Sequence, residues 1–437
     1  MSAAQSLPTT KFGHLPELID PLHWAMNPVN LRQPVLEGWP EVEPQLDTLE
    51  LERVYPRGQR GFLLEYRTEQ HCFYAELIGT NAADHYAEAS HKLRHMAVRQ
   101  SDQRYPLHLV KEAGLVLRRP GIDHRLPMLG VLNRPDQAEA LLAPQLGRRV
   151  RILSSQLLAH RLGRRAVVRL RYLPAPEQPP RSVILKCYKQ RSDRPQQIFG
   201  WMQALQGGAL EPRAAAGGRL RLVSPLHCDV SHNFLLMEDV VGIPLDQLRG
   251  QRLAAGVQDA GALLAGLQRA RLPPGAGLSP HSSAAELEIL SRWVPLTAAV
   301  FPSLAPRLHQ TWERIERGLS RLLPATPVVC HRDYYDKQLI VADDATLLLD
   351  LDTLSLADPA LDIGNFLAHM QLLELQQRGQ SAPLWRAFHA GLGGERRASA
   401  QAISLYRQAA LLRIACIHAF WSRWQHLCVP LLGACHD

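Results

Sequence analysis

The stretch that decides the fold is a short strand-rich segment near residue 340. Residues 328–341 read VVCHRDYYDKQLIV, and residues 346–352 read TLLLDLD. Two apolar runs separated by a turn predict a β-hairpin with a loop before its first strand. Such a hairpin returns Asp350 to the loop that carries Asp333 and Gln338. The three side chains would then form a hard-oxygen site suited to Mg²⁺.

The rest of the chain divides around this segment. Residues 1–48 are rich in proline and weakly periodic, which predicts an irregular lead-in. Residues 49–145 alternate in the manner of strands, with one helical run, and residues 146–241 repeat that order. Residues 242–437 are dominated by helical patterns that the strand-rich segment interrupts. The predicted fold class is α+β: a bilobal architecture with an extra N-terminal β-rich domain.

The two β-rich regions resemble copies of one lobe. Gly58 precedes Gly163 by 105 residues, and Arg60 precedes Arg165 by the same interval. We interpret residues 49–145 as a degenerate first copy. The alternative is that any two small β-rich domains look alike.

Composition excludes several functional classes. The chain has 437 residues, 46% of them hydrophobic, which is enough for two or three domains with cores. Its net charge is +8, but the arginines are dispersed and aromatic residues make up only 6%, so we expect no nucleic-acid partner. We find no signal peptide and no apolar run of the ~20 residues that span a bilayer, so we expect no membrane partner. Seven cysteines without a CxxC pair argue against zinc and fit free thiols in the cytoplasm.

The pattern His331-x-Asp333-x4-Gln338 is followed by Asp350 and then by DPALD at residues 358–362. Together these motifs resemble the catalytic block of the aminoglycoside phosphotransferase and choline kinase-like families, which have a protein-kinase-like fold. The resemblance is strong over residues 328–369 and looser from about 150 to 241. The usual amide in these families is Asn, and Gln at this position resembles the maltokinases.

The resemblance implies a role for each of these residues. Asp333 would orient the substrate hydroxyl, and His331 would support the loop. Gln338 and Asp350 would hold Mg²⁺ against the phosphates of ATP or GTP. The aspartates at 358 and 362 would pin the loop and cap the following helix.

The resemblance also implies a nucleotide site upstream. Lys186 ends an apolar strand, as the phosphate-contacting lysine of kinases does. Backbone groups near Glu238 and Val240 would bind adenine, and Gly163 lies where a turn covers the phosphates. Lys337 could supply charge near the γ-phosphate, or could equally be a solvent-facing loop lysine.

The chain departs from the kinase pattern in two ways. The helix after Lys186 has no Glu to orient that lysine, which leaves Gln197 or a water, and the first copy carries Glu76 at the lysine-like position. Only seven residues separate Asp350 from Asp358, too few for the activation segment of a protein kinase. We therefore predict a kinase whose partners are a nucleotide and a small hydroxylated substrate, a sugar, amino sugar or related metabolite. The alternative is a catalytically silent binding module of the same fold.

Overall fold

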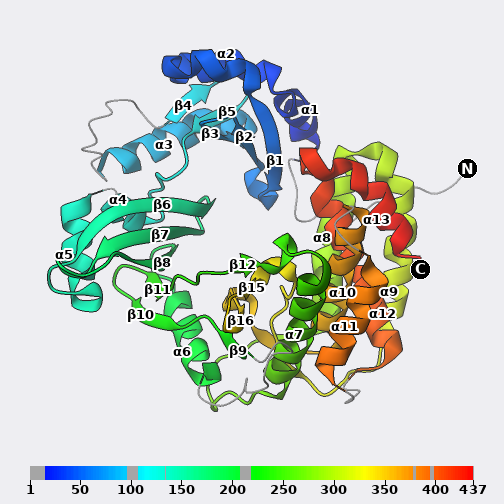
Figure 1. Ribbon diagram of the computed structural model, residues 1–437. Helices are drawn as coiled ribbons and strands as arrows, with labels where there is room; N and C mark the ends of the chain where they lie inside the picture. The colour runs from blue at the N-terminus through cyan, green and yellow to red at the C-terminus, as the bar shows by residue number, and fades with distance from the viewer. Residues whose placement is uncertain are drawn as a thin grey trace, which may run out of the picture.

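The computed structural model describes residues 15–95, 107–132, 134–206, 218–376, 380–393 and 398–436. Figure 1 shows three parts: an N-terminal domain in blue to cyan, a second β-rich lobe in teal to green, and a helical lobe that ends in red. The predicted α+β bilobal fold with an additional N-terminal β-rich domain is confirmed.

The N-terminal domain is built on an antiparallel sheet with the strand order β1-β2-β3-β5-β4. The strands are β1 (Glu50–Pro56), β2 (Phe62–Arg67), β3 (Cys72–Leu77), β4 (Leu107–Val110) and β5 (Leu115–Arg118). Helices α1 (Leu15–Met26) and α2 (Val29–Gly38) and the 3-10 segment η1 (Pro40–Thr48) precede the sheet, and α3 (Ala82–His95) follows β3.

The expected irregular lead-in over residues 1–48 is wrong for residues 15–48, which are helical, while residues 1–14 lie outside the described part. Helices α1 and α2 each tolerate an internal proline. Their apolar residues Leu22, Leu31 and Val35 are buried in the core of the domain, at 0–1% exposure. Burial of this apolar surface outweighs the poor local helix propensity.

The second lobe has the strand order β10-β11-β8-β7-β6. Its strands are β6 (Arg151–Arg161), β7 (Arg165–Leu173), β8 (Arg181–Tyr188), β10 (Pro225–Asp229) and β11 (Phe234–Glu238); its helices are α4 (Pro127–Leu132), α5 (Pro135–Leu146) and α6 (Arg194–Gln206). Residues 126–132 form a short apolar run that is compatible with a strand, but α4 occupies most of them. A short apolar run does not distinguish a buried strand from a buried helix.

The two sheets repeat one topology, as expected of copies. Each has three consecutive antiparallel strands, then a helix, then two more strands of which the last pairs with the third. Glu76 of β3 lies between Leu63 and Val116, as Lys186 of β8 lies between Val167 and Leu235. The first turn of each sheet contains a glycine in the left-handed region, Gly58 at φ 65° and Gly163 at φ 69°.

The helical lobe begins with α7 (Gly250–Arg269). It continues with α8 (Ser283–Val300), α9 (Ala305–Ser320), α10 (Ala360–Leu375), α11 (Ser381–Leu392), α12 (Ala400–Ala419), η8 (Ser422–Leu427) and α13 (Cys428–Ala434). Its short strands are β9 (Arg219–Leu222), β12 (Ile243–Pro244), β13 (Pro280–His281), β14 (Val328–Cys330), β15 (Leu339–Val341), β16 (Ala345–Leu348) and β17 (Ser355–Ala357). They form two small sheets, ordered β12-β15-β16-β9 and β13-β17-β14. In the part of the chain that the structure describes, no helix is long and apolar enough to cross a membrane.

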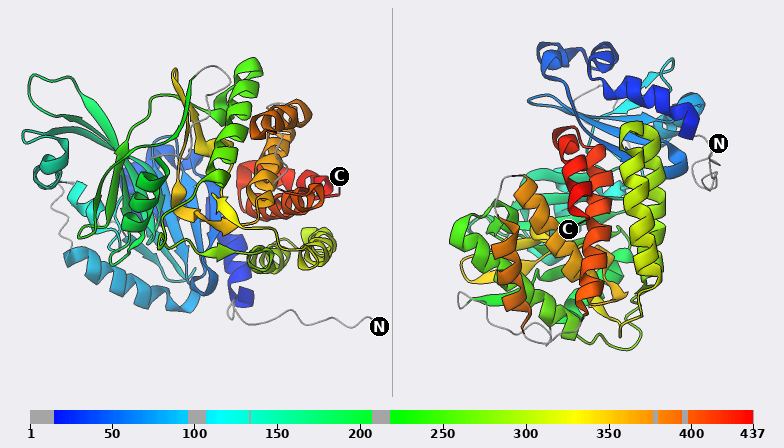
Figure 2. Two further views of the ribbon diagram at one scale, coloured as in Figure 1. Left: turned by 90° about the horizontal axis from the view of Figure 1, so that it is seen from below. Right: turned by 90° about the vertical axis from the view of Figure 1, so that its right-hand side faces the viewer.

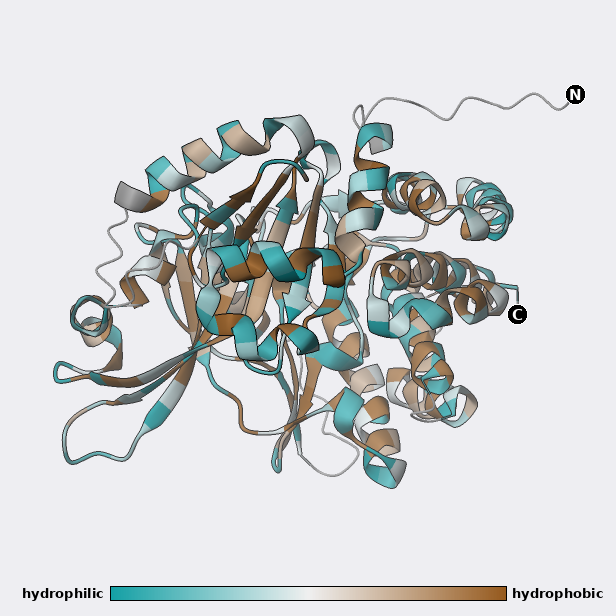
Figure 3. Ribbon diagram, turned by 90° about the horizontal axis from the view of Figure 1, so that it is seen from above, coloured by the Kyte–Doolittle hydropathy of each residue, from teal (hydrophilic) through white to brown (hydrophobic). Residues whose placement is uncertain are grey.

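The N-terminal domain contacts both lobes. Val54 of β1 donates a backbone hydrogen bond to Phe420 at 2.8 Å, and Phe420 is buried in the core of the N-terminal domain. The right-hand view of Figure 2 shows this domain above the ends of the helical lobe. On the other side, the Tyr74 hydroxyl donates to the backbone oxygen of His160 at 3.2 Å, and Tyr74 packs on Leu162. In Figure 3 the central strands are largely brown, and the surrounding helices alternate between teal and brown.

Candidate active site

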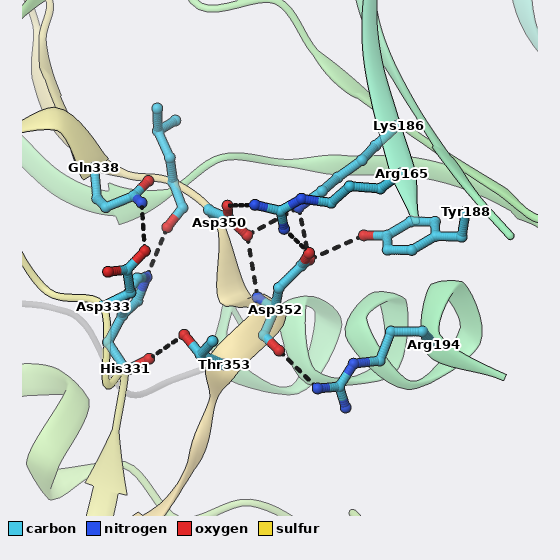
Figure 4. Close-up of polar contacts among 11 residues, drawn as sticks. Arg165, Lys186, Tyr188, Arg194, His331, Asp333, Gln338, Asp350, Asp352 and Thr353 are labelled. Atoms are coloured by element: carbon cyan, nitrogen blue, oxygen red, sulfur yellow. Dashed lines mark hydrogen bonds and ion pairs between the residues drawn. The ribbon is translucent and has the colours of Figure 1, made fainter. Parts of the chain in front are cut away.

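The loop that follows β14 is tied at both ends to the chain that follows β16. Strand β14 pairs antiparallel with β17, which sets Cys330 opposite Ser355. The His331 ring nitrogen Nε2 lies 2.9 Å from the backbone oxygen of Leu349, and the Thr353 hydroxyl donates to the backbone oxygen of His331 at 2.7 Å (Figure 4). These bonds hold the loop beside the returning strand.

Two aspartates at the start of α10, Asp358 and Asp362, stabilise the loop and the helix end beside it. The carboxylate of Asp362 accepts the backbone N–H groups of His331 at 2.6 Å and of Arg332 at 2.7 Å. Asp358 accepts the backbone N–H of Ala360 at 2.8 Å and so caps the helix. The expected pinning and capping roles of these two aspartates are confirmed. Burial raises the pKa of Asp362, and the two backbone donors act against it.

The predicted hairpin is confirmed, because β15 pairs antiparallel with β16. It brings Gln338 and Asp350 to the same region as Asp333. The Gln338 amide nitrogen donates to Asp333 at 3.2 Å, and the backbone oxygen of Gln338 accepts the N–H of Leu349 at 2.8 Å. Asp350 has a left-handed backbone, with φ at 51°. A non-glycine residue in this region is uncommon and is found where the surrounding structure fixes it.

Lys186 reaches this group from the second lobe. Its ammonium lies 2.8 Å from Asp350 and 2.6 Å from Asp352, and its side chain is 6% exposed. Arg165 of β7 pairs with the same two carboxylates, at 3.3 Å from Asp350. Figure 4 shows Lys186 and Arg165 converging on Asp350 and Asp352. The two lobes are therefore joined by a compact cluster of two cations and two carboxylates.

Asp352 was not predicted to have a role, yet it makes the densest set of contacts in the cluster. Besides Lys186 and Arg165, it accepts the Tyr188 hydroxyl at 3.0 Å, and its backbone oxygen accepts from Arg194 at 2.8 Å. It supplies the carboxylate partner for Lys186 that the helix after β8 lacks. The only sequence signal was its position two residues after Asp350. Its partners lie more than 150 residues away in the chain.

The alternative orienting residue, Gln197, is engaged elsewhere. Its amide nitrogen donates to Asp193 at 2.8 Å, and its oxygen accepts from Arg194 at 3.3 Å. Among the described residues, no hydrogen bond joins Gln197 to Lys186. Lys186 is therefore oriented by the two aspartates.

The pKa values of Lys186 and Asp350 are shifted in the cluster. Burial is the main cause that lowers the pKa of Lys186 to about 8, and Asp350 acts in the opposite direction. Burial alone would raise the pKa of Asp350, but Lys186 and Arg165 outweigh it and hold that pKa far below its usual value. At pH 7 the lysine is charged and the aspartate is ionised.

A mainly apolar cavity of about 270 Å³ opens beside the cluster. Lys186, Gln338 and Asp350 line it together with Glu238 and Val240. Its apolar lining comes from both lobes and includes Val167, Ile184, Met202, Leu235, Met237, Ile340 and Leu348. The cavity thus brings together the residues expected near adenine, Glu238 and Val240, and those expected near the phosphates and the metal. The latter are Lys186, Gln338 and Asp350.

Two expected nucleotide residues have other contacts. The backbone N–H of Gly163 donates to Asp123 at 2.5 Å, so the turn is tied to the segment that precedes α4. Lys337 is exposed, and its ammonium lies 5.6 Å from the ring centre of Trp421, the residue that precedes η8. Contact of either residue with phosphate stays a prediction.

Comparison with known proteins assigns the family. The model of the phosphotransferase enzyme family matches residues 161–400, more than half of the chain. The chain belongs to the phosphotransferase enzyme family. It is a small-molecule phosphotransferase that acts on hydroxyl groups. The match begins at the β6–β7 turn, so the N-terminal domain lies outside it.

Solved structures resemble this phosphotransferase at low identity. Spectinomycin phosphotransferase in complex with ADP and spectinomycin is 12% identical over 69% of this chain and 93% of that chain, with a TM-score of 0.48. Choline kinase from Streptococcus pneumoniae is 11% identical over 68% of this chain and 98% of that chain, with a TM-score of 0.44. A search of curated proteins found no match.

The donor set of the phosphotransferase fits a nucleotide-bound Mg²⁺. Among the described residues, no group of three or more His, Cys, Asp or Glu side chains could hold a metal ion alone. Mg²⁺ usually takes one or two carboxylates and completes its octahedron with substrate phosphates and water. Asp350 offers a carboxylate. The nitrogen of the Gln338 amide is bound to Asp333, and among the described residues no hydrogen bond occupies its oxygen.

Proposed function

We propose that this phosphotransferase transfers the γ-phosphate of ATP or GTP, bound with Mg²⁺, to a hydroxyl group of a sugar, amino sugar or related metabolite. One observation carries the proposal: Lys186, Gln338 and Asp350 line the same apolar cavity, and Gln338 is hydrogen-bonded to Asp333. A base-sized apolar cavity whose lining also includes a lysine, an amide and a carboxylate suits a nucleoside triphosphate.

Each residue has a role in the proposed transfer. The adenine or guanine would occupy the apolar part, next to the backbone of Glu238 and Val240. Lys186 would neutralise the phosphates, and Gln338 and Asp350 would hold Mg²⁺, which supplies charge stabilisation when bound.

Asp333 would orient the acceptor hydroxyl and accept its proton as the oxygen attacks the γ-phosphorus. The bond from that phosphorus to the β-phosphate oxygen breaks, and the nucleoside diphosphate leaves. His331 is fully buried, and its ring contacts the backbone of Leu349, so we assign it to support of the loop rather than to proton transfer.

The surroundings of the site favour a small acceptor that is not polycationic. The chain between Asp350 and Asp358 is taken up by a 3-10 turn and by β17, so no peptide platform forms there. Helix α12 has no Asp or Glu, which disfavours a polycationic acceptor such as an aminoglycoside. Sugars present hydroxyls without such charge.

The test is turnover with a panel of sugars and amino sugars, with ATP or GTP, at saturating Mg²⁺. We expect phosphorylation of at least one member by the wild-type protein and a loss of at least about 100-fold in Asp350→Ala, because the metal loses its carboxylate. Asp343→Ala, in the exposed hairpin turn, is the matched control and should retain wild-type turnover. Nucleotide binding without turnover on any acceptor would instead favour a silent binding module.

A further inference from the structure

A second, larger cavity lies between the N-terminal domain and the second lobe. Its volume is about 1500 Å³. It is lined by the β1–β2 turn, helix α3, the segment before α4, the β6–β7 turn and the β8–α6 loop. Both copies of the repeated sheet therefore contribute to it. We call this cavity the basic basin.

The lining of the basin is strongly cationic. Its lysines and arginines are Arg57, Arg60, Lys92, Arg125, Arg161, Arg164, Arg165, Lys189, Arg191 and Arg194. Among the described residues, only two carboxylates line it, and both are already engaged. Asp352 is paired with Lys186 and Arg165, and Asp193 accepts from Gln197.

Most of these cations have no carboxylate partner. Three of them do have one. Arg57 pairs with Glu76, Lys92 pairs with Glu88, and Arg165 pairs with both Asp350 and Asp352. Within the described residues, the other seven form no ion pair with an acid: Arg60, Arg125, Arg161, Arg164, Lys189, Arg191 and Arg194. Of these, Arg194 donates to Gln197 and to the backbone oxygen of Asp352. Holding so many like charges around one cavity is unfavourable unless an anion compensates them.

An adjoining cavity of about 260 Å³ adds an independent observation. It shares Arg57, Arg60, His124 and Arg125 with the basin. It is also lined by Arg118, which is 3% exposed and pairs with Glu76 at 3.1 Å. Two guanidinium nitrogens of Arg118, Nε and Nη2, are buried without a hydrogen-bond partner. Buried polar atoms normally have a hydrogen-bond partner, so these two donors are available to a ligand in the adjoining cavity.

The basin opens toward the catalytic cluster. Arg165, Tyr188 and Asp352 belong both to its wall and to the cluster described above. Arg161 lies within electrostatic range of Asp333: partial burial and Arg165 lower the pKa of Arg161, while Asp333 and Asp350 raise it. A ligand in the basin would therefore lie next to the phosphoryl-transfer site.

We propose that the basic basin binds a small molecule that carries clustered phosphate groups, and that the N-terminal domain forms one wall of this site. Arginine matches phosphate with two parallel N–H donors, which suits a lining of eight arginines. Among the described residues of the lining, Tyr188 is the only Phe, Trp or Tyr, and its hydroxyl is bound to Asp352. A single-stranded nucleic acid would require stacking platforms that this lining does not offer.

Two kinds of ligand carry such phosphate groups. One is an acceptor that is already phosphorylated, which rests on the proposed function. The other is an effector that is not consumed. The binding itself does not depend on the proposed function, and the experiment separates the two.

The probe is inorganic tripolyphosphate, titrated calorimetrically into the full chain. The test variant is Arg60→Gln/Arg125→Gln/Lys189→Gln, which removes three unpaired cations from three walls. The matched control is Arg148→Gln/Arg149→Gln/Arg171→Gln, which removes three exposed cations from the opposite end of the second sheet. Circular dichroism and the melting temperature show that each variant is folded.

We expect tripolyphosphate to bind the wild type and the control alike, and the test variant at least tenfold more weakly. If KM rises in the test variant for a phosphorylated sugar but not for the unphosphorylated one, the ligand is an acceptor. If tripolyphosphate changes wild-type turnover of an unphosphorylated sugar and not that of the test variant, the ligand is an effector. Equal tripolyphosphate affinity in both triple variants, or tighter binding of a single-stranded oligonucleotide that only the test variant loses, would overturn the proposal.

Discussion

Replacing Asp352 with Asn tests the feature of the site that the sequence did not reveal. The carboxylate accepts from Lys186 at 2.6 Å and from Tyr188 at 3.0 Å, and it pairs with Arg165. Asparagine keeps the shape of the side chain and removes its charge. Lys186 then faces one carboxylate, Asp350, in a setting where the lysine is 5% exposed.

The expected loss follows from these contacts. Hydrogen bonds to charged groups contribute about 1.5–3 kcal/mol. Lys186 and Arg165 both keep Asp350, so we count the loss of about one such bond, which corresponds to a decrease in kcat/KM for the nucleotide of about 10- to 100-fold. The pKa of Lys186 should fall further below about 8, because a nearby negative charge that favours the ammonium is gone.

The assay is nucleotide-dependent phosphorylation measured across pH, with two comparison variants. Gln197→Ala should keep kcat/KM within about twofold, because Gln197 contacts Asp193 and Arg194 instead of Lys186. Asp344→Asn, which breaks an exposed ion pair with Arg219, should leave the rate unchanged. Wild-type kcat/KM in Asp352→Asn, or a tenfold loss in Gln197→Ala, would refute the assignment of Asp352 as the partner of Lys186.

Three further results are expected. Nucleotide affinity should weaken as pH rises through about 8, because Lys186 then loses its charge. The Kd measured by fluorescence for the variant Lys186→Arg should not change over this pH range, because arginine stays charged. Phe420→Ala should lower the free energy of unfolding in urea by about 3–5 kcal/mol, because it empties a buried position shared with the N-terminal domain, whereas the exposed Val429→Ala should change it by less than about 0.5 kcal/mol. Chelation by EDTA should abolish turnover and added Mg²⁺ should restore it; turnover that survives chelation would exclude the metal role of Asp350.

The hairpin and its loop were predictable because the residues that determine them are close together in the sequence. Two apolar runs flank a turn, and the spacing alone returns Asp350 to the loop that holds Asp333 and Gln338. The repeated sheet was predictable for a similar reason, since the turn glycines at 58 and 163 occupy matching positions. Local pattern and tertiary structure agree at these places.

Other features depend on distant residues and could not be predicted in this way. Helix α1 contains Pro21, which disfavours a helix locally, and it forms because Leu22 is buried against the sheet. Helix propensity along the sequence does not indicate this burial. Asp352 acquires its role from Lys186 and Arg165, which folding brings from another lobe. The basic basin likewise exists only where two domains meet, and its arginines are scattered in the chain.

The central claim, phosphoryl transfer to a hydroxyl oriented by Asp333, is tested most directly by observing the product. Phosphorus NMR follows the signal of the phosphorylated acceptor in the wild type, in Asp333→Asn and in the exposed control Asp343→Asn. We predict a new phosphomonoester in the wild type and the control, formed at least about 100-fold more slowly in Asp333→Asn, because proton acceptance by a positioned carboxylate contributes at least that factor. A phosphomonoester formed at the wild-type rate in Asp333→Asn would contradict the claim.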